Sequence, residues 1–265
     1  MKHSLTIPAL LAAGLCLAAG CGSKNKVDLS SSHTTAAETM AETTEAAPPT
    51  VEETEPAADS SRPASGLSTS VETYSSGDIS IQYPVVANLN SSETEDAVNA
   101  LLKSNAISII KAQGLDETSD HLEIQCEILS ADRNRLTAIY KGELSAGGAA
   151  HPVSVFYTNT VDMGKAADIG FSTYADPHTM AGYVMSDACE FTGLDAETEQ
   201  AVKEYKATQT IDSYTKLFQK ADFPLKGTSF PESFSYEDKG AIYFSIPVPH
   251  ALGDYAIVEF TPETK

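Results

Sequence analysis

The most regular apolar–polar alternation in the chain runs through residues 122–128, where leucine, isoleucine and cysteine alternate with glutamate and glutamine. Alternation with a period of two predicts a strand with one buried and one solvated face. Residues 136–140 and 153–157 begin two more segments of this kind. Three successive strands joined by turns predict an antiparallel meander with one solvated face.

A strand and a long helix are predicted ahead of this meander. Ile79, Ile81 and Tyr83 alternate with polar positions and form the strand. The helix begins after Ser91 with an acidic first turn, carries apolar residues at helical spacing, and ends at Gly114.

Helices are predicted after the meander, and strands return at the end of the chain. Asp176-Pro177 starts a helix whose apolar face extends to Phe191 and which Gly193 ends. Residues 195–206 and 211–220 form two shorter helices in this prediction. The closing strands are predicted at residues 234–236, 242–246 and 255–260.

The order of these elements predicts an α+β domain, an antiparallel β-sheet packed by helices. Every Tyr and Phe of the chain falls within residues 71–265, which places the hydrophobic core there. We therefore assign one folded domain to residues 71–265, after a disordered N-terminal tether.

The N-terminal residues resemble a bacterial lipoprotein signal. A short basic start precedes an uncharged apolar run from Leu5 to Leu17, which is too short to span a bilayer as a helix. Small residues then lead to Cys21, which would be acylated as residues 1–20 are removed. An ordinary secretory signal with a coincidental cysteine is the alternative. We expect Cys21 to anchor the protein in the lipid bilayer, on the outer face of the bacterial cell membrane.

Residues 21–70 have the composition of a tether. Ser, Thr, Glu, Ala and Pro dominate this stretch and aromatic residues are absent, so it cannot bury enough apolar surface to offset the entropy of ordering. We expect a disordered spacer between the anchor and the domain. No later segment approaches about 18 consecutive apolar residues, so no other membrane span is predicted.

Acidic residues outnumber basic ones throughout the chain. It carries 37 Asp and Glu against 17 Lys and Arg, for a formal net charge of −20. Residues 71–265 alone hold 29 acidic and 13 basic residues, hence −16. This charge argues against nucleic acid as a partner and favours a cationic one, although a need for solubility would also explain it.

No motif with known catalytic or metal-binding spacing occurs. The chain contains no His-Glu-x-x-His, no Cys-x-x-Cys, no Gly-x-Ser-x-Gly and no Gly-rich phosphate loop. We therefore predict no metal or cofactor and expect a protein that is not an enzyme. The alternative is a cell-wall hydrolase or deacetylase-like enzyme whose site the fold assembles from His151, His178 or His250 and nearby carboxylates.

Cys126 and Cys189 are the thiols left to the folded domain if Cys21 is acylated. Outside the cytoplasm such a pair is a candidate disulfide, and a loop of this length would stabilise the fold by about 4 kcal/mol. Cys126 lies on an apolar strand face, where a cysteine also serves as a small buried hydrophobic residue. Both interpretations stay open.

The most distinctive local sequence is Ser145–Pro152, between the second and third strands of the meander. Two glycines permit positive φ, and the proline forces an extended backbone on the residue before it. The segment either only connects the strands, with His151 bonded to the backbone, or forms a recognition loop with an aromatic neighbour. The candidate binding residues are Gly147, Gly148, His151, Pro152 and Tyr157.

A family resemblance begins at this loop. It is carried by Gly147-Gly148-Ala149-Ala150-His151-Pro152, Phe156-Tyr157, Asn159, Asp162 and Gly164. This run resembles the Gly-Gly-Ala-His-Pro signature of a domain of unknown function. That domain forms the extracytoplasmic part of RsiV-like anti-sigma factors and the N-terminal module of PdaC-like peptidoglycan deacetylases.

The run from Ile242 to Phe260 resembles the closing strand pair of the same domain, so the resemblance covers roughly residues 72–262. The sequence departs from the family pattern in two places. An extra Ala stands between the Gly pair and His151, and Pro247–Leu252 replaces a segment that usually bears tyrosine and glutamate.

The resemblance implies an α+β module that binds rather than catalyses. In RsiV-like proteins this domain senses lysozyme, a cationic wall hydrolase, and a domain charge of −16 suits such a partner. We therefore expect a non-catalytic domain that binds a cell-envelope ligand. The two candidates are peptidoglycan, the wall glycan, and a cationic wall-acting protein such as lysozyme.

Overall fold

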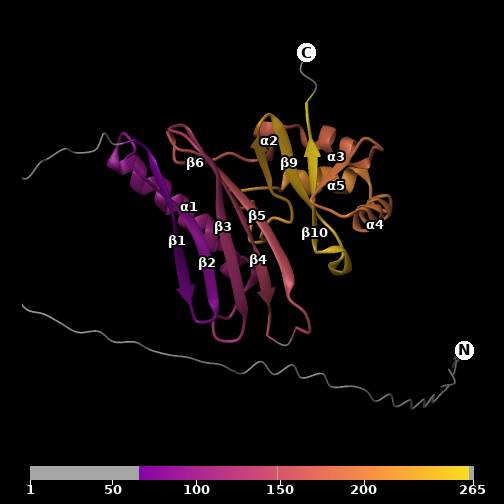
Figure 1. The fold of residues 1–265 in the computed structure, drawn as a ribbon, viewed down its shortest axis with the longest axis horizontal. Coiled ribbons are helices and arrows are strands. Elements are labelled where there is room, and N and C mark those ends of the chain that lie inside the picture. The colour runs from indigo at the N-terminus through magenta and orange to yellow at the C-terminus, as the bar shows by residue number, and fades with distance from the viewer. Residues whose placement is uncertain (1–65, 148, 263–265) are drawn as a thin grey trace, which may run out of the picture. The chain divides into compact units, whose positions relative to one another are not determined.

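A computed structural model describes residues 66–147 and 149–262. They form two β-sheets packed with helices, which confirms the predicted α+β class (Figure 1). The predicted signal peptide at residues 1–20, Cys21, and residues 22–65 of the predicted tether lie outside the described residues. Within the part of the chain that the structure describes, no helix is long and apolar enough to cross a membrane.

The first sheet has six strands in the order β1-β2-β3-β4-β5-β6. Neighbouring strands are antiparallel except β2 and β3, which are parallel because a helix carries the chain between them. The predicted meander, β3 to β5, is confirmed. Strand β1 was not predicted, and it starts at Ser68, three residues before the predicted start of the folded domain at residue 71. The strands are β1 Ser68–Ser76, β2 Ile79–Ala87, β3 His121–Ala131, β4 Arg135–Ser145, β5 Val153–Asp162 and β6 Ala167–Asp168.

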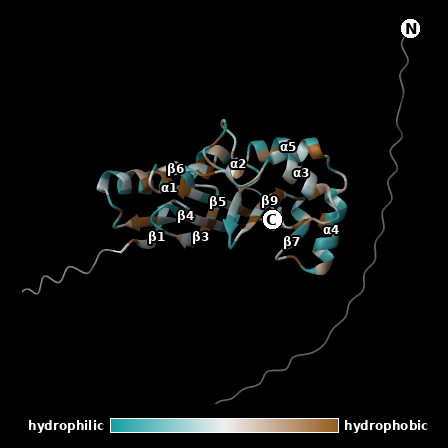
Figure 2. Cartoon of the chain, turned by 90° about the horizontal axis from the view of Figure 1, so that it is seen from above, coloured by the Kyte–Doolittle hydropathy of each residue, from teal (hydrophilic) through white to brown (hydrophobic). Residues whose placement is uncertain are grey.

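Helix α1 (Ser92–Gln113) lies along one side of the strands of the first sheet, as Figure 2 shows from above. It starts where predicted because the Ser91 side chain caps it, accepting a hydrogen bond from the Thr94 N–H at 3.3 Å. It ends at Gly114, whose φ of 67° is in the left-handed region that glycine adopts at low cost. Its buried face and the apolar residues of β2 to β5 form the first hydrophobic cluster.

The second sheet has four antiparallel strands in the order β7-β10-β9-β8. The remaining helices gather at this sheet and form the second hydrophobic cluster with β9 and β10 (Figure 1). The elements are α2 Phe171–Tyr174, α3 Pro177–Met185, β7 Glu190–Thr192, α4 Ala196–Lys206, α5 Ile211–Gln219, β8 Ser235–Asp238, β9 Ala241–Pro247, the 3₁₀ turn η1 His250–Leu252 and β10 Tyr255–Phe260.

The helix predicted from Asp176 ends earlier than its apolar spacing indicates. It begins as predicted but stops at Met185, and Phe191, predicted on its apolar face, lies in β7. The buried Lys206 closes the helix, because its Nζ donates to two carbonyl oxygens at the end of α3 at 2.8 and 2.7 Å. Pairing of β7 with β10 therefore overrides the helical pattern beyond this point.

A buried polar junction joins the two sheets. Thr158 of β5 donates from Oγ1 to the carbonyl oxygen of Ser235 in β8 at 2.7 Å. The N–H and Oγ of Ser235 in turn donate to the Asp222 carboxylate at 2.6 and 2.5 Å. All three residues are buried, so water cannot reach them. Removal of one side chain would therefore leave the polar groups that it bonds without a hydrogen-bond partner.

The junction carboxyl is sensitive to pH. Burial raises the pKa of Asp222 from 3.8 to about 7, against the opposing effect of its hydrogen bonds from Ser235. The folded state therefore keeps a proton at pH values where the unfolded chain has lost it. The resulting contribution to stability is complete below the unfolded pKa and is lost as the pH rises through about 7.

We expect Asp222→Asn to remove this pH dependence. An amide stays neutral and still accepts from the Ser235 N–H, so the variant and wild type should have similar free energies of unfolding near pH 4. Above pH 7 the wild type should be less stable than the variant, by up to about 4 kcal/mol. Urea unfolding from pH 4 to pH 8 measures this difference, and parallel pH profiles for the two proteins would contradict the assignment.

Candidate functional site

An open depression beside α5 is the candidate site, and we call it the lysine depression. Its volume is about 760 Å³, and it lies between the end of α4, one face of α5 and residues 226–232. Three lysines and three aromatic residues are among its lining side chains. The lining consists of Tyr205, Gln209, Ser213, Tyr214, Lys216, Leu217, Lys220, Lys226, Gly227, Thr228, Ser229, Phe230, Pro231, Glu232 and Pro247.

Helix α5 supplies one wall through its exposed face. Thr210 and Ser213 form a capping box that fixes its start. Phe218 is fully buried and stacks on a phenylalanine of α2, with ring centroids 4.8 Å apart, which fixes the rotation of the helix. Helical spacing then leaves Lys216 and Lys220 on the exposed face, one turn apart.

The opposite wall, residues 226–232, is fixed at two points. Lys226 donates from Nζ to two carbonyl oxygens at the end of α5, at 3.1 and 2.9 Å, where the helix dipole favours a cation. Phe230 packs edge-on against the buried Tyr157, with ring centroids 5.5 Å apart. Gly227 lies between these points at a φ of 125°, a conformation that other residues rarely adopt.

The lysine depression concentrates positive charge in an acidic domain. Lys216, Lys220 and Lys226 are all exposed, and no carboxylate of the described residues forms an ion pair with them. Glu232 is the one acidic residue in the lining. Lys216 and Lys220 can therefore bind an anionic ligand without breaking an ion pair. Lys226 already donates to two carbonyl oxygens and interacts electrostatically with the buried Asp222.

Tyr214 borders the lysine depression, but its hydroxyl is buried. The residue is 4% exposed, and its Oη has no hydrogen-bond partner among the described residues. Burial raises the pKa of Tyr214, so the hydroxyl keeps its proton and remains a donor. The hydroxyl lies beneath the surface of the depression, so a ligand there does not contact it. The site thus offers cations and aromatic rings.

The predicted recognition loop does not contribute to this depression. The Gly147 N–H donates to Asp120 Oδ1 at 2.6 Å, which holds the loop against the start of β3. Gly148 lies outside the described residues. His151 and Pro152 are exposed, so their role as a recognition surface remains a prediction.

Tyr157, predicted as the aromatic neighbour of that loop, is a core residue. It is fully buried, stacks on Tyr140 with ring centroids 4.4 Å apart, and donates from Oη to the Ala106 carbonyl oxygen at 2.9 Å. Strand alternation turns its side chain toward α1 and away from solvent. This corrects the sequence analysis, because a side chain in this position cannot contact a ligand at the surface.

Two of the three histidines considered for catalysis come together. The His151 and His250 rings have centroids 6.3 Å apart, and His250 Nδ1 lies 2.9 Å from Asp254 Oδ1. Asp254 Oδ2 also accepts the Ser154 N–H at 2.7 Å. The cluster therefore fastens the loop between β4 and β5 to the turn η1.

The third histidine lies apart from this pair. His178 is not part of this cluster, because its Nδ1 lies 3.3 Å from Thr215 Oγ1 between α3 and α5. Within residues 66–147 and 149–262, no hydroxyl or thiol is hydrogen-bonded to His151 or His250. In the same residues, no group of three or more His, Cys, Asp or Glu side chains is arranged to hold a metal ion.

Cys126 and Cys189 are both free thiols and belong to different hydrophobic clusters. Burial raises the pKa of Cys126 to about 12 and that of Cys189 to about 11, so both stay protonated and unreactive. The structure contradicts the disulfide hypothesis. It supports the alternative in which Cys126 packs as a small hydrophobic residue.

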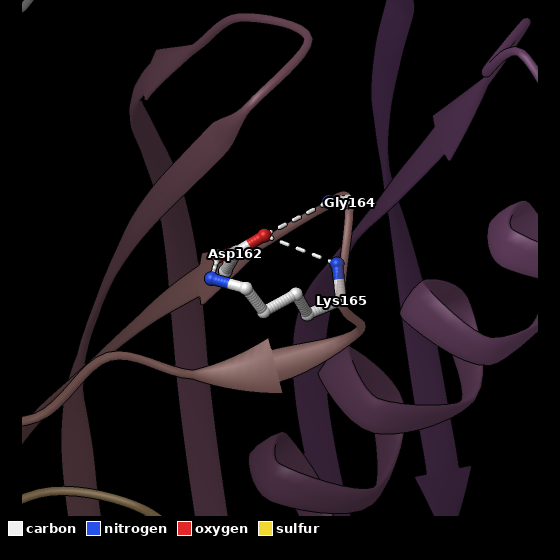
Figure 3. A network of polar contacts seen from close by, with 3 residues as sticks. All are labelled: Asp162, Gly164 and Lys165. Carbon is white, nitrogen blue, oxygen red and sulfur yellow. Dashed lines mark hydrogen bonds and ion pairs between the residues drawn. The ribbon is translucent and has the colours of Figure 1, made fainter.

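Other residues that carry the family resemblance have structural roles. Asp162 Oδ1 accepts the N–H groups of Gly164 and Lys165 at 3.0 Å each, and its Oδ2 pairs with Lys165 Nζ at 2.7 Å (Figure 3). These contacts, first the one with the Lys165 side chain, lower the pKa of Asp162. Asn159 is buried and donates to Asp168 at 2.9 Å.

Comparisons with known proteins give structural neighbours from one uncharacterised family. No protein-family model matches the chain, and no curated protein matches it. The chain is similar to the crystal structure of a DUF3298 family member (BF2082) from Bacteroides fragilis NCTC 9343, with 14% identity, a TM-score of 0.37, and coverage of 74% of this chain and 90% of that one. A DUF3298 family protein (PA4972) from Pseudomonas aeruginosa PAO1 is similar at 11% identity and a TM-score of 0.33, covering 68% and 83%.

The lysine depression was not among the sites predicted from the sequence. One signal for it was present, since Lys216 and Lys220 stand four residues apart on a predicted helix. Nothing in the sequence placed Lys226 or Tyr205 beside them, because each comes from a separate element.

We expect Asp254→Ala to loosen the loop that contains His151. The Ser154 N–H would lose its acceptor, and its hydrogen exchange should accelerate at least about tenfold. Exchange measured by NMR on the wild type and the variant tests this. Asp187→Ala is the control, because Asp187 is exposed and its carboxylate accepts no hydrogen bond from the described residues. Unchanged exchange at Ser154 would show that other contacts hold the loop.

Proposed function

We propose that this protein is a lipid-anchored, non-catalytic binding module outside the cytoplasm, and that its lysine depression binds wall glycan. The observation that supports the proposal is the gathering of three exposed lysines beside Tyr205 and Phe230 in one open depression of an acidic domain. Peptidoglycan offers matching chemistry, because it combines carboxylates with sugar hydroxyl and amide groups.

The size and lining of the depression suit a saccharide ligand. Its volume of about 760 Å³ falls in the usual range for ligand sites, about 300–1,000 Å³. Tyr205 and Phe230 supply aromatic surface for the apolar faces of sugar rings, and Gln209 supplies an amide for their hydroxyls. The lysines then favour glycans that carry carboxylates.

In this proposal Cys21 holds the protein at the membrane and residues 21–70 give it reach. Acyl chains contribute about 0.8 kcal/mol per buried CH₂, so two or more chains give a lasting anchor. A flexible chain of this length has a typical end-to-end distance of about 40 Å. The domain could therefore search the wall that lies next to its membrane.

A cationic wall-acting protein such as lysozyme is the second candidate ligand, and one observation favours it. On the exposed face of the first sheet, Glu123 of β3 stands directly opposite Glu143 of β4. Like charges opposite each other on neighbouring strands are destabilising, and a cationic partner would relieve that repulsion.

We expect the double variant Lys216→Met, Lys220→Met to bind soluble peptidoglycan fragments at least about tenfold more weakly than the wild type, a loss of roughly 1.4 kcal/mol. Methionine keeps the length and apolar stem of lysine while removing its charge. Titration calorimetry on residues 22–265 at low salt measures the affinity. Lys165→Met, Lys239→Met is the matched control, because it changes the net charge equally at two exposed lysines elsewhere.

The same titrations separate the two candidates. The cationic protein is favoured as the ligand if lysozyme binds the lysine variants as tightly as the wild type and binds the double variant Glu123→Gln, Glu143→Gln more weakly. If the two double lysine variants bind the fragments equally weakly compared with the wild type, the binding is general charge attraction and not a site. Absence of fragment binding by the wild type at low salt would contradict the proposal.

A further inference from the structure

β1 is an edge strand of nine residues in the sheet that the structure describes. It pairs with β2 along its whole length, from Ser68 opposite Ala87 to Ser76 opposite Ile79, without a bulge. No described strand pairs with its other side, and Figure 1 shows β1 at the margin of the sheet. The other strands that end a sheet are short, since β6, β7 and β8 have 2, 3 and 4 residues.

The backbone of β1 directs alternate groups toward the side that no described strand pairs with. The hairpin turn at Gly77 and Asp78 has two residues, so the pair Ser76–Ile79 is hydrogen-bonded and the even-numbered residues of β1 bond to β2. The Leu122 N–H donates to the Asp78 carbonyl oxygen from the opposite side of β2, which fits this pattern. The free N–H and C=O groups of β1 are therefore those of Thr69, Val71, Thr73 and Ser75.

β1 lacks the features that usually prevent edge strands from pairing. It contains no lysine, proline or glycine and no bulge. Its one charged residue, Glu72, accepts a hydrogen bond from Tyr83 Oη on β2 at 2.9 Å. Val71, near its centre, has its side chain at the surface and is 43% exposed.

We propose that β1 pairs antiparallel with β1 of a second copy of this chain, with each Val71 opposite its counterpart. This register places Thr69 opposite Thr73 and Glu72 opposite Ser70, and it uses the outward backbone groups of both strands. A shift of two residues would bring two Glu72 side chains face to face, which is unfavourable. The pairing is two-fold symmetric, so it closes and leaves neither copy with this free edge.

The position of β1 in the chain argues for a second copy as its partner. Residue 66 is the first described residue, so the predicted tether leads directly into β1. Chains anchored in one membrane would present identical edges to one another at a raised effective concentration. Repulsion between domains of charge −16 opposes the contact, so added salt should strengthen it. Salt should instead weaken glycan binding, which keeps the two proposals separable.

Charge substitution at Val71 tests the pairing. Val71→Lys places two ammonium groups at the symmetry axis and should raise the dissociation constant of self-association at least tenfold. Val153→Lys is the matched control, because Val153 is 44% exposed on β5, away from this edge. Energy transfer between labelled copies of residues 22–265, held on vesicles by an N-terminal histidine tag and nickel-chelating lipid, measures the association at two salt concentrations.

A cysteine at the same position gives a positive test. Opposite residues of a hydrogen-bonded antiparallel pair have Cα atoms about 5.5 Å apart, a distance that a disulfide spans. Val71→Cys should therefore cross-link copies under mild oxidation much faster than Val153→Cys, while the half-buried Cys126 and the buried Cys189 provide the same background in both variants.

The outcomes decide the proposal. Loss of association in Val71→Lys alone, together with selective cross-linking of Val71→Cys, supports it. Association that persists in Val71→Lys places the contact elsewhere and overturns it. Wild-type copies that stay monomeric on vesicles at both salt concentrations, with equal cross-linking of the two cysteine variants, also overturn it.

Discussion

The hydrogen bonds among Thr158, Ser235 and Asp222 are the constraint on which the rest of the domain depends. They are the buried polar link between a sheet covered by α1 and a sheet surrounded by four shorter helices. Asp222 also lies at the start of the segment that continues into Lys226 and Phe230. The junction thus orders both the packing of the sheets and one wall of the lysine depression, so fold and candidate site share one support.

The fold was predictable where local pattern and tertiary packing agree. Helix α1 lies between Ser91 and Gly114 as predicted, because its capping residues and its apolar face indicate the same limits. The alternating pattern of β3 predicts a strand correctly because one face of β3 is exposed to solvent. β1 carried no apolar pattern, since an exposed edge strand needs none. β7 has three residues and exists through its pairing with β10, which no local signal encodes.

The candidate site was less predictable than the fold for the same reason. The loop around His151 attracts attention because glycine and proline impose local backbone conformations that a sequence displays. Lys226 enters the lysine depression through bonds to the end of α5, and Tyr205 and Phe230 reach it from other segments. This convergence arises from packing between elements, and no local pattern in the sequence encodes it. Tyr157 is the opposite case, because it belongs to the family motif and was predicted to bind a ligand but is a residue of the hydrophobic core.

The two free thiols have a consequence for how this domain folds. Cys126 and Cys189 sit in separate clusters, so the described fold is held by packing and hydrogen bonds without a covalent link between these cysteines. The described fold therefore does not depend on oxidation of Cys126 and Cys189. The domain can reach the same folded state in aerated and in oxygen-free surroundings.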